Sequence, residues 1–229
     1  MTNKFTNRFD MMLNENEIKA RDNARVLVFG VGGVGGSLVH MLVRSGINHI
    51  GIVDFDTIDI TNVNRQLVAY SDNIGKLKVE ELELELKRIN PDIEVKKYPV
   101  KFSSEMVNKI DWNYDYIVDC IDDIKAKKLL ISIANEKNIP ILCAMGAGNR
   151  YNDIPSFEIS DINKTSYDPI AKILRKYCKD NGIKHLTVCY TKQKALKFSC
   201  AKIASVVYYP INMASVMCAK IMIDLLKRG

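Results

Sequence analysis

Four glycines lie in the segment GVGGVG, as Gly30, Gly32, Gly33 and Gly35, directly after the apolar run VLVF. Glycines permit a tight turn and let backbone N–H groups approach a phosphate at the positive end of a helix. Asp54 closes the next apolar run, IGIV, where a carboxylate can accept hydrogen bonds from ribose hydroxyls. This pattern predicts a nucleotide-binding site and leaves NAD, FAD and ATP open as its ligand.

The segment after the expected ribose site brings two cations and three amides together. Arg65 and Lys78 lie in it, with Asn62, Asn64 and Gln66 beside the arginine. An arginine can bind phosphate oxygens through two parallel hydrogen bonds, whereas a lysine acts as a point charge. A nicotinamide dinucleotide has little need of two fixed cations here. A nucleoside triphosphate needs them, because charge builds up on the α-phosphate and the departing pyrophosphate, so the pair favours ATP.

Carboxylates follow the apolar run YIV in the segment DCIDD, as Asp119, Asp122 and Asp123. They stand where a parallel strand is expected to end. Carboxylates at that edge can hold Mg²⁺ against phosphate oxygens, so the sequence predicts a magnesium site beside the triphosphate.

Short apolar runs alternate with amphipathic segments up to Gly148, and this order predicts the elements that position these groups. Strands that alternate with helices predict an α/β fold, Rossmann-like, with a mostly parallel, doubly wound sheet and helices on both faces. The expected strands are 26–30, 50–54, 93–100, 116–121 and 139–145, and the expected helices are 35–46, 76–89 and 125–137.

The regular alternation of apolar runs and amphipathic segments changes after Gly148, where we expect a C-terminal extension of the sheet. FEISDI and HLTVCY are expected strands, and IASVVYY leads as a closing strand to a helix from Ile211 to Leu226. Another helix is expected between the first two strands, with Asp168 as its N-cap, Pro169 at its first position and a glycine beyond its end.

Charge is distributed unevenly along the chain, with a nearly neutral N-terminal part and a basic C-terminal part. Residues 1–150 hold 20 Lys and Arg against 21 Asp and Glu, a sum of −1, whereas residues 151–229 hold 13 against 6, a sum of +7. Ten basic and three acidic side chains fall in 161–202 alone. This excess suggests a polyanionic partner, although from charge alone a solvated lysine face accounts for it equally well.

Cysteine and hydropathy patterns exclude several classes of protein. The six cysteines form no CxxC pair and the three histidines are scattered, which argues against a tetrathiolate zinc site and a transition-metal enzyme. No stretch approaches the roughly 18 uncharged apolar residues of a membrane span, and the first residues lack an apolar signal core. We therefore expect a cytoplasmic protein that does not associate with a membrane.

The set GxGGVG, DFD, NxNRQ, GKxK and DCxD, between about residues 25 and 148, resembles the ubiquitin-activating, MoeB and ThiF-like superfamily of ATP-dependent carboxylate adenylators. The resemblance implies ATP and Mg²⁺ as cofactors, with Asp54 at the ribose. It implies that Arg65, Lys78 and Asp122 are catalytic, the two cations at the triphosphate and the carboxylate at Mg²⁺ and the adenylated group. The expected cofactor-binding residues are Gly30, Gly32, Gly33, Gly35, Asp54, Asp56, Asn62, Asn64, Arg65, Gln66, Lys78 and Asp122.

The stretch MGAGNRYNDIPSFEISDINKTSYDPIAKILRKYCKDNGIKHLTVCY is similar to the tRNA threonylcarbamoyladenosine dehydratases (TcdA or CsdL-like), and this similarity covers nearly the whole chain. The missing CxxC pairs and the basic segment agree with that branch. It implies that ATP activates the threonyl carboxylate of a hypermodified adenosine beside the anticodon, and that the side chain then closes into a ring with loss of water. The partner is then a tRNA, expected at Lys164, Lys172, Arg175 and Lys176.

The resemblance also implies one adenylating domain over residues 1–229, with an N-terminal arm (1–24), an ATP-binding core (25–148) and a basic substrate side (149–229). It implies a homodimer and leaves a sulfur-relay partner open. Several relatives carry two arginines near the N-terminus, of which the second reaches ATP in the partner subunit. Here Arg8 is present and Met11 stands at the second position.

Rival functions remain open from the sequence. One is an adenylyltransferase that activates the C-terminus of a ubiquitin-like sulfur carrier, and the missing CxxC pairs count against it. Another is a nucleotide-binding protein without turnover, and the intact Arg65, Lys78 and Asp122 count against that. A nicotinamide dehydrogenase leaves the two cations unexplained.

Overall fold

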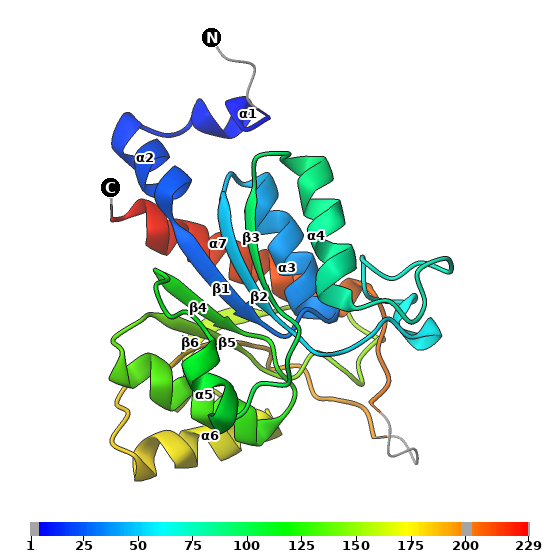
Figure 1. Ribbon diagram of the computed structural model, residues 1–229. Coiled ribbons are helices and arrows are strands. Elements are labelled where there is room, and N and C mark those ends of the chain that lie inside the picture. The colour runs from blue at the N-terminus through cyan, green and yellow to red at the C-terminus, as the bar shows by residue number, and fades with distance from the viewer. Residues whose placement is uncertain (1–4, 198–202, 229) are drawn as a thin grey trace.

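The computed structural model describes residues 5–197 and 203–228, and its centre is a seven-stranded sheet in the order β3-β2-β1-β4-β5-β7-β6 (Figure 1). Among the described strands β6 runs antiparallel to its neighbour, and the others are parallel. The expected parallel pairing of the first two strands is confirmed, with Val26 opposite Ile50. The strands are β1 (Arg25–Phe29), β2 (His49–Val53), β3 (Glu94–Tyr98), β4 (Tyr116–Asp119), β5 (Ile141–Ala144), β6 (Glu158–Asp161) and β7 (Thr187–Tyr190).

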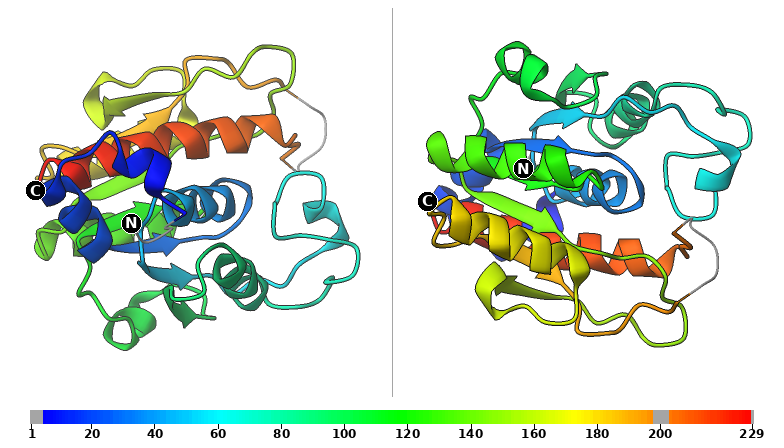
Figure 2. Two further views of the ribbon diagram at one scale, coloured as in Figure 1. Left: turned by 90° about the horizontal axis from the view of Figure 1, so that it is seen from above. Right: turned by 90° about the horizontal axis from the view of Figure 1, so that it is seen from below.

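Helices cover both faces of this sheet (Figure 2). The central strands are apolar on both sides because both sides are covered: Val26 and Val28 pack on one face, Leu27 and Phe29 on the other. One face carries α3 (Gly33–Arg44), α4 (Lys78–Ile89) and α7 (Tyr208–Leu226), and the other carries α5 (Ile124–Glu136) and α6 (Pro169–Asp180).

The helix after β6 is capped as its sequence predicts. The Asp168 carboxylate accepts a hydrogen bond from the Ala171 backbone N–H at 2.9 Å, and Pro169 occupies the first helical position. Gly182 follows the helix end with a φ of +69°, a backbone conformation that favours glycine.

The expectation of a closing strand over IASVVYY is wrong for its described residues. No strand is assigned to residues 203–207, and α7 begins at Tyr208, with Pro210 in its first turn. The backbone polar groups of this segment bond to a loop instead of a strand, because the Asn149 N–H donates to the Ala204 carbonyl and the Ala204 N–H to the Asn149 side chain.

An N-terminal pair of helices that the sequence did not lead us to expect lies at the end of the sheet where the strands begin (Figure 1). α1 (Asn7–Asp10) and α2 (Glu15–Asn23) come before β1, and α2 starts with a capping box between Asn14 and Glu17. Arg21 is buried and pairs with carboxylates of both helices. Short 3₁₀ helices complete the fold: η1 (Ile60–Asn62), η2 (Ser104–Lys109) and η3 (Ile162–Lys164).

By length and hydropathy, α7 is the one helix in the described parts of the chain that could span a membrane. Nine of its residues, including Met213, Met217 and Ile221, are buried against α3 and the sheet. Its apolar composition is therefore used in the core of this fold.

Candidate active site

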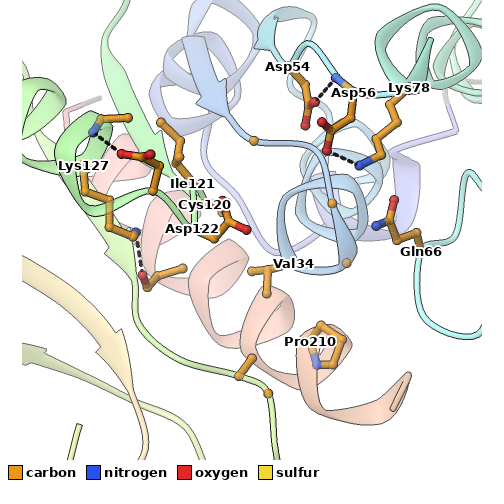
Figure 3. A pocket seen from close by; sticks show the side chains of 18 of the residues that line it. Val34, Asp54, Asp56, Gln66, Lys78, Cys120, Ile121, Asp122, Lys127 and Pro210 are labelled. Atoms are coloured by element: carbon orange, nitrogen blue, oxygen red, sulfur yellow. Dashed lines mark hydrogen bonds and ion pairs between the residues drawn. The ribbon is translucent and has the colours of Figure 1, made fainter. Parts of the chain in front are cut away.

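A cavity of about 510 Å³ opens where β1, β2, β4 and β5 end (Figure 3). In doubly wound sheets ligands bind outside the carboxyl ends of the strands, and most of the predicted residues meet there. Those that line the cavity are Gly30, Gly32, Gly33, Asp54, Asp56, Asn62, Arg65, Gln66, Lys78 and Asp122.

The glycine turn forms the floor on the β1 side. Gly30 has a φ of +82°, and a Cβ added there would meet the Cys120 carbonyl oxygen at 2.7 Å. Gly35 lies behind the turn rather than in the cavity wall. A Cβ at Gly35 would stand 1.9 Å from the Gly30 carbonyl oxygen, so this residue keeps the start of α3 close to β1. The N-terminus of α3 thereby faces the cavity with free backbone N–H groups.

Asp54 is fixed at the end of β2 by two backbone donors. Its Oδ2 accepts from the Val31 N–H at 2.7 Å and its Oδ1 from the Asp56 N–H at 2.8 Å. Burial raises the pKa of this carboxyl above its usual value, although the two donors oppose the shift. The carboxylate oxygens are held at the cavity wall, where they retain capacity for a second donor such as a ribose hydroxyl.

Lys78 begins α4 and its side chain is buried at the cavity edge, paired with Asp56. Nζ lies 2.8 Å from the Asp56 Oδ2, and the Lys78 N–H also donates to the Asp56 carbonyl at 3.0 Å. An ammonium held in this way has lost its rotamer freedom before any ligand arrives. The arrangement can present one fixed positive charge to a phosphate.

Arg65 and Gln66 follow η1, and both side chains belong to the cavity wall. The Arg65 Nη1 donates to the Thr61 carbonyl at 2.6 Å and to the Asn64 side chain at 3.0 Å, which leaves other guanidinium N–H groups for a ligand. Gln66 is 6% exposed, and its Oε1 has no hydrogen-bond partner among the described residues. A buried acceptor without a partner fits a site that a polar ligand completes.

The two predicted asparagines have different surroundings. Asn62 is buried in the cavity wall. Its Oδ1 accepts a hydrogen bond from the Asp59 N–H at 3.1 Å, which caps the start of η1. Asn64 does not line the cavity, because its Nδ2 donates to the Ser205 carbonyl at 3.0 Å. Asn64 thus joins the η1 loop to the segment before α7.

The three carboxylates at the end of β4 and just after it have three different surroundings. Asp119 is fully buried and pairs with Lys127 at 2.9 Å, so the expectation that it faces a metal is wrong. Asp123 caps α5 through the N–H groups of Lys125 and Ala126. Asp122 lines the cavity and is exposed, which leaves it available to a ligand.

Magnesium fits this site only together with a nucleotide. Among the described residues, no group of three or more His, Cys, Asp or Glu side chains could hold a metal ion. Mg²⁺ is usually bound by one or two carboxylates together with substrate phosphates and water. Asp122 lines the cavity and is the residue that would supply a protein ligand to such a site.

Two buried cations that were not predicted from the sequence shape the far wall. The Lys127 Nζ donates to the Ala144 carbonyl at 2.9 Å, besides its pairing with the β4 carboxylate. Arg150 is buried and donates through Nη1 to the carbonyls of Gly146 and Gly148 at 3.0 and 2.9 Å. Burial lowers the pKa of Arg150. Helical spacing could have found Lys127, which lies on the buried face of α5 with Leu130.

The four predicted substrate-side residues lie outside the cavity. Lys164, Lys172 and Lys176 are on η3 and α6 and do not line it. Arg175 is half-buried, and its guanidinium donates to the carbonyls of Ile162 and Thr165 at 3.0 and 2.7 Å. These hydrogen bonds link α6 to η3, so the guanidinium has a structural role, whereas the three lysines are exposed to solvent.

Most of the described cysteines have the surroundings of core residues. Cys143 is buried in β5, whereas Cys120, directly after β4, is partly exposed and lines the cavity. Burial raises the pKa of both thiols. Burial also raises the pKa of Cys178 to about 11, so no thiolate is favoured there. Cys200 lies outside the described residues. Arg8 and Met11 are exposed at α1 and do not line this chain's cavity.

Comparison with known proteins agrees with this geometry. The model of the ThiF family matches residues 8–207. The tRNA threonylcarbamoyladenosine dehydratase of Bacillus subtilis (strain 168) is 38% identical over 178 residues, which cover 77% of this chain and 70% of that protein. The protein of the same name from Escherichia coli (strain K12) is 32% identical over 171 residues, which cover 74% and 63%.

A solved structure has the same fold. The E. coli tRNA N6-threonylcarbamoyladenosine dehydratase in complex with ATP matches with a TM-score of 0.90 at 24% identity, over 97% of this chain and 94% of that chain. The chain spans less than two thirds of the full length of the curated E. coli relative. The family match and the curated relatives together lead to one assignment: this chain belongs to the ThiF family, in the branch of the tRNA threonylcarbamoyladenosine dehydratases.

Proposed function

We propose that this protein is an ATP-dependent dehydratase, which adenylates the threonyl carboxylate of N6-threonylcarbamoyladenosine in tRNA and cyclises it with loss of water. The observation that carries the proposal is the meeting of Arg65, Lys78 and Asp122 at one cavity beside the glycine turn. The names of the curated relatives support the substrate, and the ATP complex of the E. coli enzyme supports the nucleotide.

The cations supply the electrostatic part of the reaction. A free carboxylate is a poor electrophile, and ATP, when bound, supplies AMP as its leaving group. Lys78 and Arg65 both line the cavity, and in this proposal their charges offset those on the transferring phosphate and the departing pyrophosphate. Positioned cations of this kind are worth on the order of 10³-fold or more in rate.

The second half of the reaction needs mainly positioning. The carbamoyl group of the substrate attacks the activated carbonyl, and AMP leaves with the former carboxylate oxygen. Because nucleophile and electrophile belong to one side chain, the effective molarity is high and little further catalysis is required. Met145 and Ile170 line the same cavity as Asp122 and can exclude water from this step.

The proposal includes Mg²⁺ at Asp122, held together with the phosphates. It also retains the organisation expected from the sequence, in which residues 25–148 form the ATP-binding core and residues 149–229 the basic substrate side of one domain. We also propose that the protein is cytoplasmic, and the proposal does not include a sulfur-relay partner.

We also propose that the protein is a homodimer. Exposed apolar side chains gather in η1 and the loop that follows it, and the Asn64–Ser205 hydrogen bond ties this loop to the segment before α7, which exposes Val207. Clustered apolar exposure of this kind is typical of an interface. Light scattering on the purified chain should give twice the monomer mass, and a monomer at micromolar concentration would contradict this part. The loop residues concerned are Ile60, Val63, Leu67 and Ile74.

The decisive test is the release of AMP and pyrophosphate from ATP-Mg²⁺, with tRNA that carries threonylcarbamoyladenosine and with unmodified tRNA. We expect release with the modified tRNA alone, and a nucleoside that has lost the mass of one water. Pyrophosphate exchange without any response to tRNA would instead indicate a protein carrier as the substrate. No turnover with either tRNA would leave a nucleotide-binding protein.

A further inference from the structure

An aromatic side chain with most of its surface in solvent precedes a residue that is hydrogen-bonded to the cavity wall. Tyr167 is 69% exposed and has a φ of +60°, a conformation that a bulky residue rarely adopts. The next residue, Asp168, is buried and accepts hydrogen bonds from the N–H groups of Gly146 and Ala171. Gly146 and Ile170 both line the cavity, so the Asp168 hydrogen bonds hold the backbone next to Tyr167 against the cavity wall.

One cation contacts this ring, and further lysines lie near it in the sequence. The Lys194 Nζ lies 5.4 Å from the centroid of the Tyr167 ring, in cation–π contact, yet the ring stays exposed. In the sequence, Lys164 precedes Tyr167 on η3 and Lys172 follows it on α6, and both are exposed. None of these three lysines forms an ion pair with a carboxylate within the described residues.

This combination matches the physics of single-stranded RNA recognition. Unpaired bases stack on exposed aromatic rings, while lysines and arginines neutralise the phosphates that follow. An apolar protein partner explains the exposed ring but does not explain the unpaired lysines around it. The geometry therefore favours RNA.

We propose that Tyr167 is a stacking platform for an unpaired anticodon-loop base next to the modified adenosine, with Lys194 at the adjoining phosphate. This inference rests on the proposed function, and it names how the tRNA is held when the threonyl carboxylate enters the cavity. Tyr167 is a positioning residue, because stacking fixes the neighbouring nucleotide rather than the reacting atoms.

The test uses the full chain and an anticodon stem-loop that carries threonylcarbamoyladenosine, with 2-aminopurine as the nucleotide on its 3′ side. Stacking on an aromatic ring quenches 2-aminopurine, so wild-type protein should lower its fluorescence on binding. Tyr167→Ala should abolish this quench and weaken RNA binding about tenfold or more, with an unchanged KM for ATP. Tyr167→Phe, which retains the ring, should bind within about twofold of wild type.

Two further variants separate stacking from a structural role. Tyr167→Gly removes the ring and accommodates the positive φ, so it should lose RNA affinity like Tyr167→Ala without loss of thermal stability. Tyr70→Ala, an exposed aromatic on the loop after η1, is the matched control and should leave RNA binding unchanged.

Each outcome decides between the two proposals. If wild-type protein turns over the modified tRNA but Tyr167→Ala binds the stem-loop as tightly as wild type, the stacking role is overturned and the proposed function stands. If Tyr167→Phe is as weak as Tyr167→Ala, the hydroxyl rather than the ring makes the contact, which also overturns it. If wild-type protein binds no RNA, the proposed function and this inference fail together.

Discussion

The lysine at the cavity and the lysines of η3 and α6 outside it differ in how their charges are paired. On the nucleotide side, Lys78 is buried and paired with Asp56. On the substrate side, Lys164, Lys172 and Lys176 have no carboxylate partner within the described residues. Charges that are fixed in advance can act on a transition state, whereas unpaired surface charges await a ligand that neutralises them. This difference supports the proposal that the first side holds the nucleotide and the second a large polyanion.

The largest effect is expected when the fixed cation, Lys78, is removed. Lys78→Ala should lower the rate of ATP-dependent turnover by on the order of 10³-fold or more, because the transferring phosphate is deprived of a positioned charge. Pyrophosphate release with the modified tRNA measures it. Lys76→Ala is the matched control, since this lysine is two residues away, exposed and paired with Glu81. If both variants retain full activity, the nucleotide side does not use its buried charge.

The next largest effect is expected from the ion pair beneath the cavity. Lys127→Met leaves Asp119 buried without its cation, and the free energy of unfolding should fall by about 3–5 kcal/mol. Urea denaturation measures the decrease. The double variant Asp119→Asn/Lys127→Met should recover most of it, because an amide carries no charge to desolvate. Lys125→Met, at an exposed position on α5, should change stability by less than about 0.5 kcal/mol.

The nucleotide side was largely predictable from sequence because its patterns are local. A glycine turn between a strand and a helix, followed by an acidic strand end, places Gly30 and Asp54 together whenever the two strands are parallel neighbours. Lys78 was also within reach, since it opens a helix that follows the same loop. Here short-range patterns determine where the chemistry is located.

The substrate side was predictable only in part because long-range contacts shape it. Arg150 binds carbonyls up to 43 residues away, at Gln193, and no sequence pattern indicates that hydrogen bond. The sequence does not distinguish Arg175 from the basic lysines near it, yet its guanidinium N–H groups donate to two carbonyls at η3. The antiparallel pairing of β6 with β7 and the hydrogen bonds between Ala204 and Asn149 likewise join segments far apart in the sequence.

The third prediction concerns the unpaired lysines themselves. The double variant Lys172→Gln/Lys176→Gln should weaken binding of any tRNA, and the slope of log affinity against log salt should fall by about 1 for each phosphate that is no longer neutralised. Filter binding at several salt concentrations measures this slope, and the KM for ATP should not change. Lys87→Gln is the control, because Lys87 is paired with Glu83 at 2.8 Å. Equal slopes for wild type and double variant would mean that RNA does not touch α6.

The smallest effect comes from the paired charges on the face of α4, and it depends on pH. Hydrogen bonds from Lys87 and Lys97 lower the pKa of Glu83 below its usual value. A carboxylate whose folded pKa is depressed contributes its full stability above the unfolded pKa, about 4.3, and this contribution disappears as pH falls through the folded value. Glu83→Gln should therefore cost roughly 0.5 kcal/mol at pH 7 and almost nothing once pH lies below the folded pKa. Urea midpoints of wild type and variant, measured across that range, test this, with Glu136→Gln on α5 as the control. A difference that stays constant across pH would mean that the substitution disturbs packing rather than charge. The lysines of α4 and β3 would then stabilise the fold through ion pairs no more than the lysines of α6 do.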